Sequence, residues 1–237
     1  MPGFDDLLTL QTHDSAVDRL RHKRAALPER ALLQEALVAD VRLREQLAEA
    51  AGRRDALVRE ERRLEDEATR LRTKATEEDK RMYSGTVSSP RELQAMQADI
   101  DQLRRHAAEI EESELEVMEQ REGVDAEVAA FEADAAKLSA DMDRLTATIA
   151  EAEAAIDAEL AVELSARDAI VPNVAADVLK LYEEIRVKNR GTGAGRLTGA
   201  NCGACHLALP ATEVDRIRHL PADTLVRCEH CGAILVR

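Results

Sequence analysis

The hydrophobic residues of this chain recur with a heptad spacing over most of its length. Counting alternately three and four residues from Leu93 to Ile156, 17 of the 19 positions are apolar. The same count from Leu43 to Met82 finds nine apolar positions out of 12. So narrow a stripe, sustained every 3.5 residues, is typical of coiled-coil helices and not of helices buried on all sides in a globular core.

A short connection separates the two heptad regions and indicates an antiparallel hairpin. Gly85 ends the first helix, and Ser89-Pro90-Arg91-Glu92 carries the signals of a helix start, with a capping serine, a proline in the first turn and a glutamate that completes a capping box. Helices joined by so few residues lie side by side. We therefore predict a mainly α protein, a long antiparallel coiled-coil hairpin with arms at about 5–82 and 89–170.

The polar interruptions of the two arms support one register for this hairpin. When Met82 is paired with Leu93, Leu71 falls opposite Leu103, Leu64 opposite Ile110 and Leu57 opposite Val117. Two polar layers also coincide: Glu61 faces Glu114, and Arg54 faces Arg121. Two like charges buried together without water are strongly destabilising, so we expect these side chains to extend to solvent or to opposite charges. The two layers either fix the register or mark a partner or bending site.

Prolines divide the chain further at the end of the hairpin away from the connection. Pro28 separates a helix at about 5–27 from the rest of the first arm, and Pro172 ends the second arm. Apolar residues at helical spacing then predict a base helix over 173–188 that packs on residues 5–27, which completes a hairpin domain at 1–188. Three glycines within residues 189–195 predict a flexible linker over 189–200.

Composition and charge narrow the function. Aromatic residues make up 2% and charged residues 34% of the chain, which suits long helices with a thin seam. Residues 89–187 carry 25 acidic against 9 basic residues, so this arm repels phosphate, and any nucleic-acid contact must use the first arm or the tail. The sequence has no 18-residue apolar run and no phosphate-binding GxxxxGK[ST] motif, which argues against a membrane span and against the simplest coiled-coil ATPase.

All four cysteines lie in two CxxC pairs near the end of the chain: Cys202, Cys205, Cys228 and Cys231. Four thiolates form a closed tetrahedral cage that suits one structural Zn²⁺ per chain. We predict a zinc ribbon over 201–237, with strands at 207–209, 224–227 and 233–237 and a helix at 212–220. Gly203 and Gly232 fit the turns of the two CxxC knuckles.

Other interpretations of the cysteines are weaker. A disulfide needs an oxidising compartment, and the opening Met-Pro-Gly-Phe-Asp-Asp has no basic and apolar leader, so we expect a cytoplasmic protein. A redox CxxC normally begins a helix in a βαβ unit, and no such pattern flanks either pair here. A RING-type cross-brace needs eight metal ligands, which this chain cannot supply. A neighbouring His206 or His230 in place of one cysteine remains an alternative ligand.

Three segments together resemble a known family: Ser89-Pro90-Arg91-Glu92-Leu93-Gln94, Leu181-Tyr182, and the two cysteine knuckles, the second continuing as Gly232-Ala233-Ile234-Leu235. The chain resembles a bacterial family of coiled-coil hairpin proteins that end in a C4-type zinc ribbon. The resemblance implies a cytoplasmic, non-enzymatic adaptor. Relatives have been linked to chaperoning secretion or transcription components and to binding nucleic acid. Ala233 and Val236 stand where family members often have a basic and an aromatic residue.

Two functions follow from these features. The first is a zinc-binding adaptor or chaperone-like scaffold, with protein partners, no catalytic residues and no small-molecule substrate; its candidate contacts at the hairpin tip are Tyr83, Val87 and Glu92. The alternative is a nucleic-acid-binding protein that acts through arginines around the zinc ribbon. These are Arg190, Arg196, Arg216, Arg218 and Arg227. The net charge of −14 and the lack of aromatic residues in the tail favour the adaptor.

Overall fold

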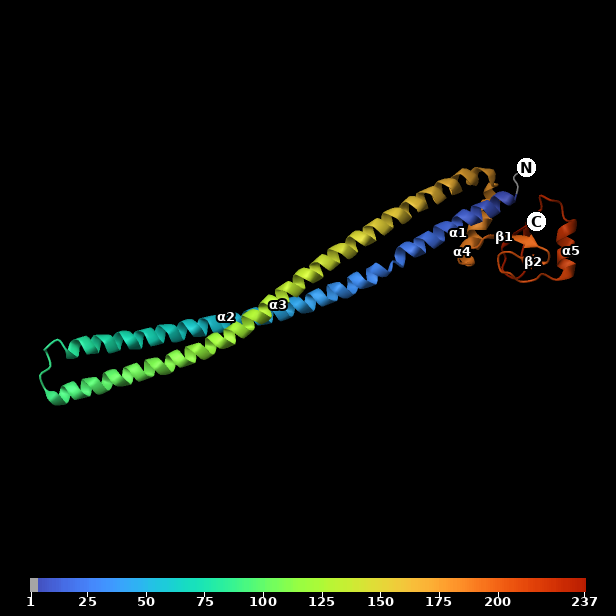
Figure 1. The fold of residues 1–237 in the computed structure, drawn as a ribbon. Helices are drawn as coiled ribbons and strands as arrows, with labels where there is room; N and C mark the ends of the chain where they lie inside the picture. Colours follow the sequence, from blue (N-terminus) through green and yellow to red (C-terminus); the bar gives the residue numbers. More distant parts are fainter. Residues whose placement is uncertain (1–3) are drawn as a thin grey trace. The chain divides into compact units, whose positions relative to one another are not determined.

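The computed structural model describes residues 4–237, and its two longest helices form the predicted hairpin (Figure 1). Helix α1 (Asp5–Ala25) precedes α2 (Pro28–Met82), and α3 (Pro90–Ile170) returns antiparallel to α2. The prediction of a mainly α hairpin with a C-terminal zinc ribbon is confirmed. The chain divides into two compact units, which we call the base unit, the residues up to Leu32 together with Leu145–Arg237, and the arm unit, Leu33–Arg144.

Local signals set the ends of the long helices. Pro28 is the first residue of α2, and Pro90 is the first residue of α3, where a missing N–H costs nothing. Gly85 adopts a left-handed φ of 77° in the turn between them. The amide of Leu93 donates to the carbonyl of Ser89 at 3.0 Å and so closes the first turn of α3.

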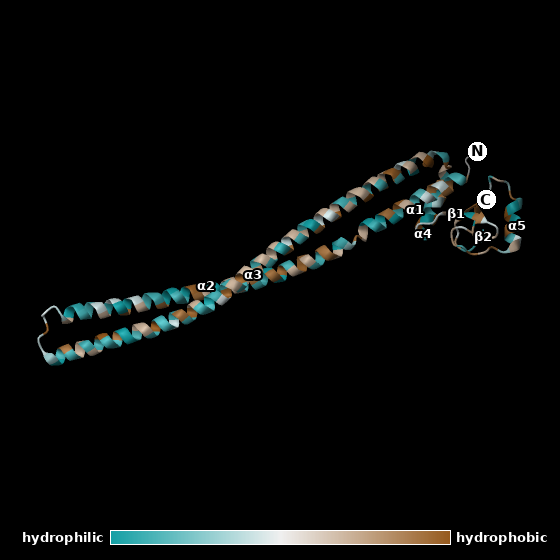
Figure 2. Cartoon of the chain, viewed as in Figure 1, coloured by the Kyte–Doolittle hydropathy of each residue, from teal (hydrophilic) through white to brown (hydrophobic). Residues whose placement is uncertain are grey.

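The arm unit is held by a narrow seam. Apolar and polar residues alternate along both helices (Figure 2), and several of the fully buried positions are alanines, which let the helices approach closely. Next to the turn, one apolar cluster joins the arms as the predicted register requires. It consists of Ala75, Met82 and Ile100, with Leu93, Met96 and Leu103 packed against them.

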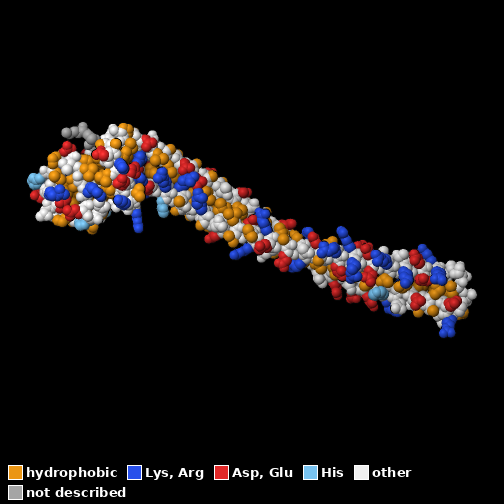
Figure 3. All heavy atoms as spheres, turned by 180° about the vertical axis from the view of Figure 1, so that it is seen from behind, with side chains coloured by type: hydrophobic (Ala, Val, Ile, Leu, Met, Phe, Trp, Pro, Cys, Tyr) orange, Lys and Arg blue, Asp and Glu red, His pale blue; other side chains and the backbone are white. Residues whose placement is uncertain are grey.

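An ion pair between the two helices links the two predicted polar layers. Arg121 of one layer donates to Glu61 of the other at 2.5 Å, so their charges neutralise each other. Arg54 lies 3.3 Å from its neighbour Asp55. The like charges therefore do not face each other in a dry seam. Basic and acidic side chains intermingle over the outer surface of the helices (Figure 3), as expected of solvated coiled-coil faces.

In the base unit, α4 (Ala176–Lys188) packs against α1 after a 3-10 turn at Val171–Asn173. Their shared core contains Leu7 and Leu10 of α1 with Tyr182 and Ile185 of α4. A buried carboxylate lies beside this core: Asp14, which is 2% exposed.

We call the polar contacts around this carboxylate the Asp14 network. Asp14 accepts hydrogen bonds from Tyr182 Oη at 2.7 Å and from Arg167 Nε at 2.8 Å. Arg186 lies 3.7 Å from it and pairs with Asp18 at 2.6 Å. The network ties α1 to both α3 and α4.

A small sheet follows α4 directly, which corrects the predicted linker. Strand β1 (Ala194–Thr198) begins inside the segment expected to be flexible and runs parallel to β4 (Ile234–Val236). The strand order is β2-β1-β4-β3, with β2 at Asn201–Cys202 and β3 at Val226–Arg227. Gly193 and Gly195 of this segment allow Tyr182 and the backbone of Ala204 to approach closely.

The remaining elements lie near their predicted positions. Helix α5 (Ala211–His219) corresponds to the helix expected at 212–220, and β3 and β4 fall within the strands expected at 224–227 and 233–237. The strand expected at 207–209 is reduced to one bridge between Asn201 and Ala208. Among residues 4–237, no helix is both long enough and apolar enough to cross a bilayer.

Candidate metal centre and hairpin tip

The two CxxC knuckles bring the four cysteine sulfurs together. The Sγ atoms of Cys202 and Cys231 are 3.9 Å apart, as are those of Cys205 and Cys228, and all four lie within 4.8 Å of one another. A tetrahedral zinc ion with Zn–S distances of about 2.3 Å requires sulfurs about 3.8 Å apart. A disulfide would need about 2.05 Å. The donor set and its spacing therefore fit zinc and not a disulfide.

The two knuckles share one backbone geometry. In the first, the amide of His206 donates to the carbonyl of Cys202 at 2.8 Å; in the second, Gly232 donates to Cys228 at the same distance. Both residues have a left-handed φ, 61° for His206 and 76° for Gly232. Gly232 thus fills the conformational role that was predicted for it. Gly203 serves differently, because a Cβ there would lie 2.7 Å from the carbonyl oxygen of Arg196.

The imidazoles are placed outside the sulfur cage. The metal-ligand group found among the described residues consists of the four cysteines and includes neither His206 nor His230. His230 Nε2 instead lies 3.3 Å from the carbonyl oxygen of Ala208. Four sulfurs therefore account for a complete tetrahedron.

The protonation of the thiols depends on their surroundings. Burial raises the pKa of the Cys202 thiol and raises that of Cys231 to about 12, whereas the backbone N–H of Leu207 lowers the pKa of Cys205. With no metal bound, the raised pKa values of Cys202 and Cys231 keep these two thiols protonated at neutral pH. A bound zinc ion would hold all four as thiolates, so its binding releases protons.

The ribbon has a small core of its own. Leu209, Val214, Ile217, Val226 and Leu235 pack around Cys202 and Cys228. The last residue, Arg237, donates to the carbonyls of Ile217 and Leu220 at 2.9 and 2.8 Å and satisfies the end of α5. A core this small would gain much of its folding energy from a bound zinc ion.

Family comparisons agree with both parts of the chain. The model of the CT398-like coiled coil hairpin domain matches residues 10–190, and that of the C4-type zinc ribbon domain matches residues 201–235. The chain belongs to the CT398-like coiled-coil hairpin family. The resemblance seen in the tip, base and cysteine segments is thereby confirmed.

Relatives align over almost the whole chain. Two proteins of Mycobacterium tuberculosis, the uncharacterized proteins MT2288 and Rv2229c, are each 31% identical over 98% of this chain and 94% of their own length. A solved structure from Mycobacterium smegmatis has a TM-score of 0.84 at 29% identity, covering 98% of this chain and 96% of that one. CT398 from Chlamydia trachomatis, with the same coverage, has a TM-score of 0.69 at 17% identity and shares the fold.

Within this family fold, three of the five candidate nucleic-acid arginines are engaged within the chain. Arg196 pairs with Asp5 at 2.6 Å, and Arg216 pairs with Glu213 at the same distance. Arg227 donates to the carbonyl of Gly232 at 3.1 Å and so supports the second knuckle. Arg190 and Arg218 are exposed. The five side chains therefore do not form one free basic surface.

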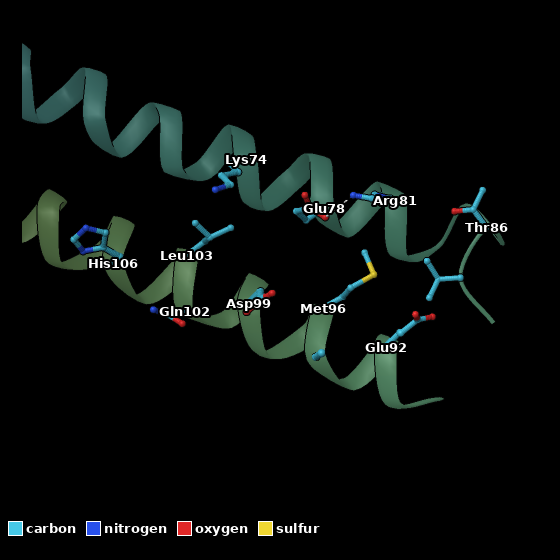
Figure 4. Close-up of a pocket in the computed structure, with 12 residues that line it drawn as sticks. Lys74, Glu78, Arg81, Thr86, Glu92, Met96, Asp99, Gln102, Leu103 and His106 are labelled. Atoms are coloured by element: carbon cyan, nitrogen blue, oxygen red, sulfur yellow. Dashed lines mark ion pairs between the residues drawn. The ribbon is translucent and has the colours of Figure 1, made fainter. Parts of the chain in front are cut away.

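The hairpin tip gathers two of the three candidate partner contacts. Val87 and Glu92 line a groove of about 830 Å³ between the end of α2 and the start of α3, together with Met96 and Leu103 (Figure 4). Charged residues of both signs, among them Lys74 and Asp99, border it. Tyr83 does not line the groove but is 77% exposed in the adjoining turn.

Sequence reasoning missed the residues that join the helices of the base unit to one another and to the ribbon. Asp14 joins the helices, and Gln11 and Asn189 join them to the ribbon. All three belong to no motif, and in a helix-rich, highly charged sequence they resemble solvated positions. The sequence does contain one signal for this joint. Gly193 and Gly195 are two residues apart, and glycines at such spacing are typical of a strand to which another part of the backbone packs closely.

Proposed function

We propose that this protein is a non-enzymatic adaptor that binds a protein partner at the tip of its hairpin and holds one structural zinc ion in its C-terminal ribbon. The observation that carries the proposal is the 77% exposed Tyr83 beside the groove at the end of the arms. Large aromatic side chains at exposed sites are frequent anchors in protein interfaces. The role of the hairpin is then to present this end of the molecule.

The metal centre supports a structural role for the zinc ion. Four sulfurs fill all four positions of a tetrahedral ion, so no position remains for a substrate or an activated water. The thiols must also stay reduced to bind metal, which supports a cytoplasmic location. Metal analysis of the purified chain should return one zinc per chain.

The tip has the chemistry of a protein-binding surface. Met96 and Leu103 offer apolar area between charged rims, and the half-buried Val87 adds to it. This mixture of an apolar centre and a polar border is common in non-obligate interfaces. It provides no obvious preference for phosphate, since carboxylates such as Glu78 and Glu92 lie beside the basic residues.

The first experiment places a photoreactive amino acid at Tyr83 in the full-length protein, in its native cytoplasm. The matched control places it at Leu115, which is exposed on the same unit but away from the tip. We expect cross-links to a defined protein from position 83 and not from position 115. Equal cross-linking from both positions, or none from 83, would count against the tip.

A second variant replaces residues 83–88 by a Gly/Ser turn of equal length. Helicity and zinc content should remain unchanged, because the seam and the ribbon lie elsewhere, while the partner found by cross-linking should be lost. If that partner is still retained, the tip is only a connecting turn, and the acidic second arm becomes the leading candidate surface.

The nucleic-acid alternative makes a separate prediction. Binding through phosphate neutralisation weakens steeply as salt rises. With Arg196, Arg216 and Arg227 engaged inside the chain, we expect only weak binding of short RNA and DNA. Tight binding with a steep salt slope, lost on substitution of Arg190 and Arg218, would favour the alternative over the adaptor.

A further inference from the structure

Within the base unit, the zinc ribbon is joined to helices α1 and α4 through the backbone of β1 and the residues before it. β1 pairs with β4, the strand that follows the second knuckle, and the amide of Ile234 donates to the carbonyl of Gly193 at 2.9 Å. At the first knuckle, the amide of Gly203 donates to the carbonyl of Arg196 at 2.8 Å. The same short strand therefore contacts both halves of the metal centre.

The close packing on both sides of β1 leaves no space for larger residues. A Cβ at Gly193 would lie 2.5 Å from the ring of Tyr182, and one at Gly195 would lie 2.4 Å from the backbone nitrogen of Ala204 in the first knuckle. The chain from Gly193 to Gly195, at the start of β1, thus lies between α4 and the first knuckle. Because this packing is close, a displacement of the strand at α4 must also displace the backbone of the first knuckle.

Two side-chain amides hold this arrangement. Gln11 of α1 accepts hydrogen bonds from the amides of Gly193 at 2.6 Å and Ala194 at 3.2 Å, and it donates to the carbonyl of Gly191 at 2.7 Å. Asn189, just after α4, donates to the carbonyl of the zinc ligand Cys231 at 2.9 Å. Gln11 is buried, so its loss would leave backbone donors without partners.

We infer that Gln11 and Asn189 are positioning residues of the metal centre, and that zinc binding is energetically coupled to the docking of β1 on α1 and α4. Asn189 fixes the backbone of the second knuckle from the hairpin side. Gln11 fixes the strand against which both knuckles are built. By linkage, whatever strengthens the docking must strengthen zinc binding by the same factor, and zinc must stabilise the docked base in return.

The test measures the zinc affinity of the full-length protein by competition with a chromophoric chelator. Asn189→Ala and Gln11→Ala should each weaken zinc binding about tenfold, the size of effect typical of residues that support metal ligands. Gln34→Ala, an exposed glutamine of α2, and Asn173→Ala, an exposed asparagine of the base unit, are the matched controls and should bind zinc as the native chain does. All measurements are made where circular dichroism shows unchanged helicity.

A conservative variant separates positioning from a general loss of stability. Gln11→Glu keeps the oxygen that accepts from Gly193 and Ala194 but loses the donor to Gly191, so its zinc affinity should lie between those of the native chain and Gln11→Ala. The inference is overturned if Asn189→Ala and Gln11→Ala both bind zinc within about twofold of the controls, because residues that support metal ligands weaken binding by more than that.

Discussion

The base unit and the arm unit are built from the same kind of helix but are held together differently. The arm unit repeats one thin apolar seam, and many of its ion pairs lie at the surface, such as Arg53–Glu127 at 2.7 Å and Arg72–Glu111 at 2.8 Å. Exposed pairs of this kind contribute little stability. The base unit buries Asp14, Gln11 and Tyr182 in specific polar contacts. Single substitutions should therefore matter far more in the base unit.

The difference also concerns what each unit can tolerate. In a repeated seam, a substitution alters one of many similar layers, and the remaining layers still hold the two helices together. In the base unit, β1, Asp14 and the four cysteine sulfurs belong to no repeat, and each connects parts that are distant in the sequence.

Removal of one zinc ligand should have the largest effect. Cys228→Ser should lose zinc on dialysis and unfold the ribbon, because structural zinc contributes on the order of 10 kcal/mol to such modules. Circular dichroism should still show the helices of the arm unit. The control is His230→Ala, which should retain zinc, since His230 lies outside the sulfur cage. Loss of zinc from the histidine variant with retention in the cysteine variant would contradict the four-cysteine site.

Asp14→Asn should be the most harmful substitution of a charged residue. It leaves Arg167 and Arg186 beside a neutral group and should lower the free energy of unfolding of the base unit by about 3 kcal/mol. Asp134→Asn removes an exposed pair with Lys137 in the arm unit and should have no measurable effect. Thermal unfolding of both variants compares the two losses of stability. Equal losses would contradict the difference between the base unit and the arm unit.

Two glycine substitutions of the same type should act in opposite directions. Gly193→Ala places a methyl group against Tyr182 and should cost about 2 kcal/mol by overpacking. Gly52→Ala lies within α2 with nothing within 4 Å of the new methyl group, so better helix propensity should stabilise the chain by about 0.5 kcal/mol. Chemical denaturation should therefore give shifts of opposite sign; a stabilising Gly193→Ala would show that β1 is not tightly packed.

The phenol of Tyr182 should give the base unit a dependence on alkaline pH. Burial and the hydrogen bond to Asp14 raise the pKa of Tyr182 well above its ordinary value of 10.0. The unfolded chain loses this proton near pH 10 while the folded chain keeps it, so the stabilising contribution is complete below pH 10 and declines as the pH rises.

The ultraviolet absorbance of the phenolate follows this titration in a Tyr83→Phe background, where Tyr182 is the remaining tyrosine. Tyr182 should stay protonated above pH 10 until the base unit unfolds. Tyr182→Phe should cost about 1 kcal/mol at neutral pH through the lost hydrogen bond and should flatten the decline at alkaline pH. Ordinary titration of Tyr182 in the folded protein would contradict its place in the network.

The hairpin and the metal ligands were accessible from the sequence because they repeat or follow fixed spacings. Heptads, Pro28, Gly85 and Pro90 specify the long helices through local geometry, and the CxxC spacing brings two sulfurs together in each knuckle. The sequence could predict that the like charges of the polar layers do not face each other without water. It could not predict that Arg121 pairs with Glu61.

The joint between ribbon and base could not be predicted in the same way. Gln11 contacts Gly193, which is 182 residues further along the chain, and no local pattern encodes that contact. A glycine-rich segment has the same composition whether it is a mobile linker or a strand that must let other backbone approach. Only the packing of Tyr182 and Ala204 on either side of β1 decides between the two.

The central claim is that zinc stabilises the base unit through β1 while the arm unit is independent of the metal. Hydrogen exchange of the full-length protein, with zinc and after its removal by a chelator, tests this most directly. The account predicts that exchange rises in α1, α4 and β1 when zinc is removed and stays unchanged over residues 50–110. Unchanged exchange in α1 and α4, with the ribbon alone losing protection, would contradict it.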